Sequence, residues 1–178
     1  MKNVLVIGHT GYLGSYITDV IDPIITDLRF ESSYIDWSLL KASNPQIDTV
    51  IITARACSKT SPRRTADTMG LEIRGLTNIL STFRDCHIIY TSSKAVYSID
   101  NKQNKPISRR TITDYIINSI NRTRINNTIV LPVHEPDLIF DKDLTEEYNI
   151  YANTKKCAEI LIKRFAHTYT ILRIWDII

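Results

Sequence analysis

The sequence predicts an α/β fold in which a doubly wound parallel sheet carries helices on both faces. Short continuous apolar runs, typical of strands buried on both sides, recur along the chain. Segments with apolar residues at helical spacing separate these runs. Such alternation favours parallel strands joined by right-handed crossovers. At 178 residues the chain is long enough for one domain that needs neither disulfides nor a structural metal.

The first half of the chain predicts strands and helices in strict alternation. The apolar run 3–7 predicts the first strand, and helical spacing over 12–21 predicts the helix that follows it. Pro23 ends this helix, because the residue before a proline is driven out of helical geometry. Strands are then expected at 24–27, 48–53 and 87–90, with helices between them at 37–42 and 68–84.

The last third of the chain returns to this pattern after an insertion. A helix is expected over 149–167 and a strand over 169–174. Before them, residues 98–148 form an irregular segment that is first basic and then acidic. Within it, the apolar residues of 115–120 fit one face of a helix, and 128–131 fits a strand. We therefore expect a single domain over 1–178, with an insertion before the last helix.

Composition excludes several classes of protein. Hydrophobic residues make up 43% and charged residues 23% of the chain, which argues against disordered and fibrous proteins. The net charge of +3 is too small to indicate a nucleic-acid partner, and no apolar run is long enough to span a membrane. The three cysteines form no CxxC pair, and the chain opens directly on a strand. We expect a soluble cytoplasmic protein with free thiols and no metal site.

Three of the five glycines stand where the first strand meets the first helix. They form the segment Gly8-His-Thr-Gly11-Tyr-Leu-Gly14. Glycine at this spacing allows a tight turn, close approach to a pyrophosphate, and close packing of helix on strand. The free N–H groups at the start of the helix, around Tyr12 and Leu13, favour phosphate. A tight turn alone would explain two of these glycines. In context they indicate a Rossmann-type sheet with a dinucleotide site.

An acidic residue strengthens this interpretation. Asp27 ends the second expected strand 19 residues after Gly8, where dinucleotide sites have a carboxylate for the adenosine ribose. A solvated aspartate at a strand end is the plainer alternative. A carboxylate at this position repels the 2′-phosphate of NADP, so NAD is the favoured cofactor. Arg29 is able to soften that repulsion, so NADP stays open.

A tyrosine and a lysine share one face of the last helix. Tyr151 and Lys155 are four residues apart, the spacing that brings side chains together on a helix. An ammonium beside a phenol lowers the pKa of the phenol, as an acid/base tyrosine requires near neutral pH. This spacing is also common by chance. The same spacing recurs in Tyr90 and Lys94, but a strand and turn would splay those two side chains apart.

Two serines follow the fourth expected strand. Ser92 and Ser93 lie at the carboxyl edge of the predicted sheet, where open α/β sheets bind their ligands. A hydroxyl at this edge is able to hold a substrate oxygen while a tyrosine moves the proton. Turn formation or helix capping would explain these serines equally well.

Taken together, these residues resemble the extended short-chain dehydrogenase/reductase superfamily, in particular its NAD-dependent nucleotide-sugar epimerases and dehydratases. The resemblance covers most of residues 1–97 and 149–175, with motifs in the family's order. These motifs are the glycine turn, Asp27, Tyr34-Ile-Asp36, Asp48 to Ala56, Gly75-Leu-Thr-Asn78, Ile89 to Tyr97, Tyr151 to Lys155 with Glu159, and Ile171-Leu-Arg173.

The resemblance implies a role for each matching residue. Ser93 would hold the reacting oxygen, and Tyr151 would be the catalytic acid/base. Lys155 would hold the nicotinamide ribose and depress the pKa of the tyrosine. Further contacts to the cofactor would come from Asp36, Trp37 and Ala54, the first two at the adenine.

The sequence also departs from the family. Glu72 stands where the family often has an asparagine. The family continues beyond the position of Leu172-Arg173 into a substrate lobe, most of which this sequence lacks. The resemblance therefore leaves the nucleotide-sugar half of the site absent, or rebuilt by residues 98–148 or by a partner subunit. Relatives commonly dimerise through the tyrosine helix, so a homodimer is an expectation from the resemblance.

Three functions follow as hypotheses. The first is an epimerase, dehydratase or dehydrogenase in which NAD takes a hydride from a sugar nucleotide while Tyr151 takes the proton. The second is a non-catalytic dinucleotide-binding or regulatory module. The third is a reductase of another small carbonyl substrate. In each case we expect small-molecule ligands, without nucleic-acid or membrane partners.

Overall fold

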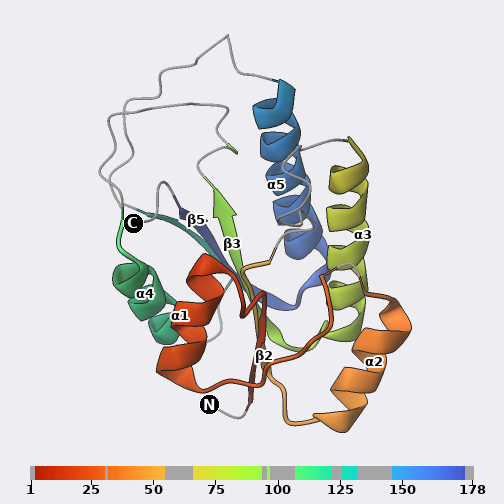
Figure 1. Ribbon diagram of the computed structural model, residues 1–178, viewed down its shortest axis with the longest axis vertical. Helices are drawn as coiled ribbons and strands as arrows, with labels where there is room; N and C mark the ends of the chain where they lie inside the picture. Colours follow the sequence, from red (N-terminus) through yellow and green to blue (C-terminus); the bar gives the residue numbers. More distant parts are fainter. Residues whose placement is uncertain are drawn as a thin grey trace.

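The structure is a computed structural model that describes residues 3–30, 32–54, 66–93, 96, 107–121, 126–131 and 146–174. Five parallel strands form one sheet in the order β1-β2-β3-β5-β4, with helices on both faces (Figure 1). In chain order the elements are β1 (Val4–Ile7), α1 (Tyr12–Ile21), α2 (Tyr34–Ser43), β2 (Thr49–Ile52), α3 (Ala66–Thr82), β3 (His87–Ser93), α4 (Arg109–Asn121), β4 (Asn127–Leu131), α5 (Glu146–Phe165) and β5 (Thr168–Ile174). The predicted doubly wound α/β fold is confirmed.

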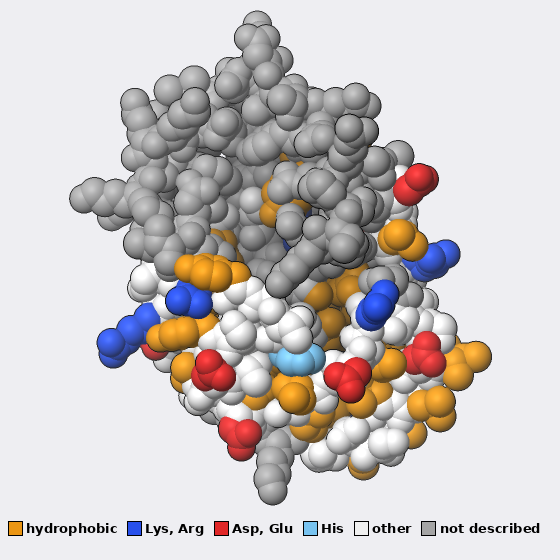
Figure 2. Space-filling model, in the orientation of Figure 1, with side chains coloured by type: hydrophobic (Ala, Val, Ile, Leu, Met, Phe, Trp, Pro, Cys, Tyr) orange, Lys and Arg blue, Asp and Glu red, His pale blue; other side chains and the backbone are white. Residues whose placement is uncertain are grey.

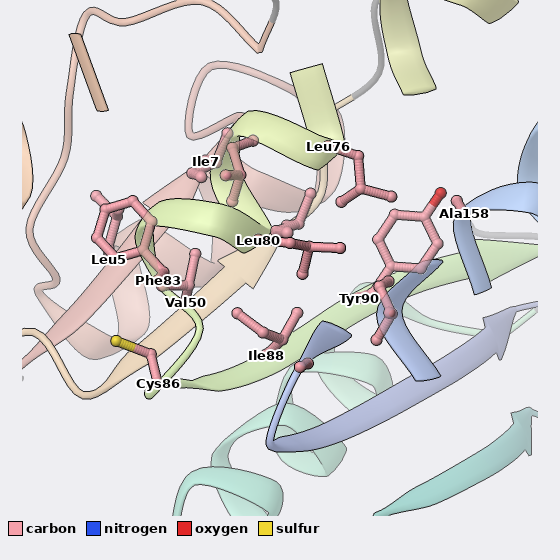
Figure 3. Close-up of a cluster of buried hydrophobic side chains, with 14 of the residues drawn as sticks. Leu5, Ile7, Val50, Leu76, Leu80, Phe83, Cys86, Ile88, Tyr90 and Ala158 are labelled. Atoms are coloured by element: carbon pink, nitrogen blue, oxygen red, sulfur yellow. The ribbon is translucent and has the colours of Figure 1, made fainter. Parts of the chain in front are cut away.

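Two apolar layers enclose the sheet because each strand is apolar on both sides. On one face, α2, α3 and α5 cover a core that includes Leu80, Phe83 and Tyr90 (Figure 3). On the other face, α1 and α4 pack against the alternate strand residues, such as Val6 and Ile89. Burial on both sides explains why the strands appear in the sequence as continuous apolar runs rather than alternating ones.

The strand expected at 24–27 is reduced to one bridge. Ile24 pairs with Leu5 on the free side of β1, and its backbone bonds to Val4 and Val6. No further strand pairs with this segment among the described residues, and the side chain of Ile25 is half exposed. The pairing of this segment with β1 therefore does not extend beyond Ile24.

The inserted segment contains regular structure. Although its composition is irregular, its described residues include α4 and β4, which confirms the helix face and strand suggested by 115–120 and 128–131. Strand β4 lies at the outer edge of the sheet, beside β5. The chain therefore passes over the position of β5 and later returns to it.

This detour reverses the hand of two connections. Helix α1 lies on one face of the sheet and connects β1 to Ile24, in the direction away from β2. Helix α3 lies on the other face and connects β2 to β3, in the opposite direction along the sheet. Helix α4 leads in the same direction as α3 but on the face of α1, and α5 leads back on the face of α3. The α4 and α5 crossovers thus have the opposite hand to the α1 and α3 crossovers. The expectation of uniformly right-handed crossovers is wrong.

No helix in the described part of the chain is long and apolar enough to cross a membrane. The described residues also contain no cluster of potential metal ligands, and neither Cys86 nor Cys157 forms a disulfide. On the face shown in Figure 2, the described acidic and basic side chains are interspersed rather than gathered into one patch.

Candidate functional site

The sheet register brings the predicted site segments to one edge. Ile7, Ile52 and Tyr90 are partners across three neighbouring strands. The glycine turn follows Ile7 directly, Ala54 follows Ile52 by two residues, and the serines follow Tyr90. Counting on from the bridge at Ile24 also puts Asp27 at this edge. The carboxyl edge of the sheet is therefore the candidate site, as expected for an open α/β fold.

Two glycines of the turn are required by the packing. Gly8 has a φ of +95°, and a Cβ on it would lie 2.6 Å from the backbone nitrogen of Ala54. A Cβ on Gly14 would lie 2.0 Å from the carbonyl oxygen of Gly8. Helix α1 therefore approaches the end of β1 more closely than any side chain allows. Gly11 closes the turn by donating its N–H to the Gly8 carbonyl at 2.9 Å.

Among the described residues, no side chain satisfies the backbone donors at the start of α1. Its N-cap is Gly11, which has no side chain to accept a hydrogen bond, and the first turn contains no acidic residue. Tyr12 and Leu13 are the first residues of the helix, with Tyr12 more than half exposed. Free N–H groups and the positive end of the helix dipole suit a phosphate, so these residues fit the pyrophosphate of a dinucleotide.

The residues expected at the adenine end have different surroundings. Asp27 is exposed at the carboxyl edge, where its carboxylate is accessible to a ribose. Asp36 is exposed on α2, where its carboxylate accepts hydrogen bonds from the Ser33 N–H and hydroxyl in a capping box. Trp37 has no exposed surface and packs edge-on against Phe83 in the core. We therefore leave Trp37 out of the proposed cofactor contacts.

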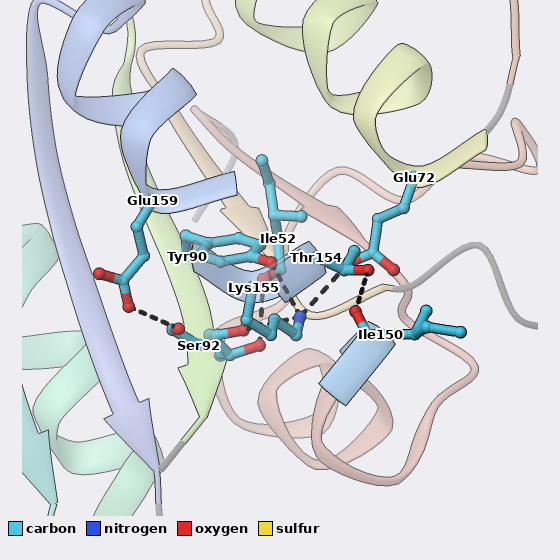
Figure 4. A network of polar contacts seen from close by, with 9 residues as sticks. Ile52, Glu72, Tyr90, Ser92, Ile150, Thr154, Lys155 and Glu159 are labelled. Atoms are coloured by element: carbon cyan, nitrogen blue, oxygen red, sulfur yellow. Dashed lines mark hydrogen bonds and ion pairs between the residues drawn. The ribbon is translucent and has the colours of Figure 1, made fainter. Parts of the chain in front are cut away.

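Lys155 is buried in a cluster of polar groups (Figure 4). Its ammonium donates a hydrogen bond to the Tyr90 hydroxyl at 2.8 Å and to the Thr91 carbonyl at 3.4 Å. It also forms an ion pair with Glu72 at 3.5 Å. We call Lys155, Glu72, Tyr90 and the Thr91 carbonyl the Lys155 cluster. The cluster joins α5 to α3 and β3 directly beneath the carboxyl edge.

Burial and neighbouring charge determine the protonation of this cluster. Burial raises the pKa of the Tyr90 phenol well above its usual value, although the nearby ammonium of Lys155 partly opposes this. For Lys155, burial alone would lower the pKa, but interactions with Tyr90 and Glu72 outweigh burial and raise it. Tyr90 is therefore neutral and Lys155 positively charged at neutral pH.

Tyr151 and Lys155 lie on one face of α5, as their spacing predicts. The ammonium of Lys155 is 5.9 Å from the centroid of the Tyr151 ring and 4.6 Å from that of Tyr90. Tyr151 is half-buried, whereas Tyr90 is fully buried. Of these two phenols, Tyr151 is thus the one with a surface for a ligand.

The two serines point in opposite directions. Ser92 donates its hydroxyl hydrogen to Glu159 of α5 at 2.7 Å. Strand alternation places Ser93, the last residue of β3, on the opposite face of the sheet, where it is half-buried. Ser92 therefore anchors the tyrosine helix, whereas Ser93 lies on the other face of the sheet from that helix, and its role in holding a substrate oxygen stays a prediction.

Glu159 anchors α5 to two neighbouring strands. Besides Ser92, its carboxylate accepts hydrogen bonds from Arg173 Nε at 3.0 Å and from Arg173 Nη2 at 2.6 Å. The Glu159 side chain is almost fully buried, so this paired contact ties α5 to β3 and β5. Because Glu159 lies one turn beyond Lys155, the same contact fixes the helix that carries Tyr151 and Lys155.

We expect Glu159→Ala to lower the free energy of unfolding by about 3 kcal/mol, because the Arg173 guanidinium loses its buried partner. Urea denaturation measures this loss. The matched control is Asp85→Ala, which removes a carboxylate that is 88% exposed and pairs with His167. That change is expected to cost less than about 1 kcal/mol. Equal losses in the two variants would contradict the anchoring role of Glu159.

Sequence reasoning missed the partners of Lys155. It treated Glu72 as a departure from a motif and Tyr90 only in a rejected pairing with Lys94, which lies outside the described residues. One signal was available: Tyr90 is a polar group at the end of an apolar strand, and Glu72 is an acid among apolar residues of a helix. Buried polar groups of this kind need partners.

Comparisons with known proteins identify the fold. No protein-family model matches the sequence, and no curated protein matches it. A dTDP-4-dehydrorhamnose reductase from Bacillus anthracis, in complex with NADP, has a TM-score of 0.58 at 16% identity, over 97% of this chain and 53% of that one. A UDP-glucose 4-epimerase from Brucella ovis, in complex with NAD, has a TM-score of 0.53 at 16% identity, over 97% and 51%.

A third match is the UDP-glucose 4-epimerase from Thermotoga maritima with UDP-glucose, with a TM-score of 0.59 at 16% identity, over 96% of this chain and 54% of that one. At these identities the similarity shows the fold, and it confirms the Rossmann-type sheet inferred from the glycine turn. The chain spans about half the length of these solved structures.

Proposed function

We propose that the chain is an NAD-dependent oxidoreductase of the epimerase/dehydratase type that acts on a sugar nucleotide. One observation carries the proposal: the uncapped start of α1 and the helix that carries Tyr151 and Lys155 border the same edge of the sheet. A phosphate site and an acid/base pair at one edge suit hydride transfer to a dinucleotide. The fold is shared with reductases and epimerases of sugar nucleotides.

The cofactor would lie along the glycine turn. Gly8 and Gly14 let the start of α1 pack closely against the end of β1 and against Ala54, and the N–H groups of Tyr12 and Leu13 would bind the pyrophosphate. Asp27 would accept the ribose hydroxyls, and Ala54, packed against Gly8, would line the path beneath. Asp36 has an exposed carboxylate near the adenine end in this assignment. The pyrophosphate site is the part that the packing supports most directly.

Tyr151 would act as the acid/base. A bound nicotinamide would supply the hydride acceptor, and the phenolate form of Tyr151 would take the proton of the substrate hydroxyl, so that the carbon bearing that hydroxyl becomes a carbonyl. Ser93 would hold the reacting oxygen at the end of β3. Lys155 would hold the nicotinamide ribose and keep a positive charge beside the phenol of Tyr151.

A second candidate is a non-catalytic dinucleotide-binding module. It is favoured by the hydrogen bonds of Lys155, whose ammonium already contacts Tyr90, Thr91 and Glu72. Calorimetric titration with NAD and NADP, followed by assays of NADH formation with UDP- and dTDP-sugars, separates the two. Binding together with turnover supports the oxidoreductase. Binding without turnover on any sugar nucleotide supports the module, and no binding excludes both.

We expect Asp27→Asn to reduce the preference for NAD over NADP by about tenfold, because it removes a carboxylate that repels the 2′-phosphate. The ratio of the two dissociation constants from calorimetry measures this. The control is Asp19→Asn, which neutralises an exposed aspartate of α1 and should leave the ratio unchanged. If both variants behave alike, Asp27 does not contact the ribose.

A further inference from the structure

A buried acid changes the charge beneath the candidate nicotinamide position. Glu72 extends from α3 to within 3.5 Å of the Lys155 ammonium, and both side chains are only 6% exposed (Figure 4). The Glu72 carboxylate therefore places a buried negative charge beside the Lys155 ammonium.

The other described groups that face Lys155 include no second carboxylate. From β3 these are the Tyr90 hydroxyl and the Thr91 carbonyl, and from α5 it is the Tyr151 ring. Among the residues that the structure describes, Glu72 is thus the carboxylate that balances the ammonium. With Glu72 the pair has a net charge near zero, and without it the net charge would be near +1.

We propose that Glu72 determines the relative affinity of the site for the oxidised and reduced forms of the nicotinamide cofactor. The inference rests on the proposed function, in which Lys155 holds the nicotinamide ribose. The oxidised ring carries a positive charge and the reduced ring carries none. A lone ammonium beside the ring would repel the oxidised form, and the Glu72 carboxylate cancels that repulsion. Glu72 is therefore a positioning residue that acts through Lys155 and favours NAD⁺.

The test compares the binding of both cofactor forms to Glu72→Gln, which removes the charge but keeps the shape. Calorimetry gives the dissociation constant of NAD⁺, and fluorescence titration gives that of NADH. Relative to the unmodified chain, we expect the affinity ratio to shift toward NADH by about fivefold or more. Measurements at pH 6 favour the protonated form of Lys155 in this variant. A purely structural role would weaken both forms equally and leave the ratio unchanged.

Two control variants isolate the buried charge. Asp67→Asn removes the same charge from an exposed position in the first turn of α3 and should not move the ratio. Glu72→Asp keeps the charge and should preserve most of the preference. If the Gln variant does not fold, Glu72→Asn removes the charge with a smaller side chain.

The outcomes separate this inference from the proposed function. A folded Glu72→Gln variant that binds both cofactor forms with an unchanged ratio overturns the role of Glu72. If the unmodified chain binds neither form, the proposed function itself fails. A shift toward NADH in Glu72→Gln but not in Asp67→Asn supports the inference.

Discussion

Replacing Gly14 with alanine is expected to lower the affinity for NAD by about 100-fold or more. The new Cβ would lie 2.0 Å from the carbonyl oxygen of Gly8 and 2.9 Å from the hydroxyl of Thr53. Because the Gly8 carbonyl is backbone, it cannot rotate away as a side chain would. Helix α1 must therefore move away from β1, and the N–H groups at its start move with it. Calorimetric titration with NAD measures the loss.

The same substitution should destabilise the fold by about 1–3 kcal/mol, the usual cost of overpacking. The control is Gly70→Ala, because a Cβ on Gly70 meets nothing within 4 Å. Gly70 lies inside α3, so this change should stabilise the chain by up to about 1 kcal/mol and leave NAD binding unchanged. If Gly14→Ala binds NAD as the unmodified chain does, the glycine turn is not the cofactor site.

Local geometry explains which parts of the site could be predicted from the sequence. The glycine turn needs only the end of one strand and the start of one helix, so its spacing is visible over seven residues. Tyr151 and Lys155 share a helix face for the same local reason. The partners of Lys155 could not be found in this way. Glu72 and Tyr90 lie 83 and 65 residues away along the chain and meet Lys155 only after the sheet and α5 have packed.

The fold was predictable to a similar extent. The apolar runs identified each of the five strands, because both faces of the sheet are covered. The order of the last two strands was not predictable, because nothing in the runs 127–131 and 168–174 specifies which of them pairs with β3. That choice depends on α5, whose Glu159 pairs with Ser92 of β3 and Arg173 of β5. These contacts hold β5 beside β3 and leave the outer edge to β4.

Tyr151→Phe is expected to reduce turnover by about 100-fold to 10,000-fold while NAD binding changes little, because the variant loses the acid/base hydroxyl but keeps the ring. The assay follows NADH formation, or epimerisation, with UDP- and dTDP-sugars as substrates. Calorimetry on the same samples shows whether the cofactor still binds. A loss of turnover with retained binding assigns the proton transfer to Tyr151.

The matched control is Tyr115→Phe, which removes a phenol from α4 on the opposite face of the sheet. It should leave both turnover and binding unchanged. Tyr90→Phe addresses the other phenol near Lys155: because Tyr90 is fully buried and neutral, its loss should weaken the positioning of Lys155 but cannot remove the acid/base. If turnover survives in Tyr151→Phe but is lost in Tyr90→Phe, Tyr151 is not the acid/base, and the proposed mechanism is overturned.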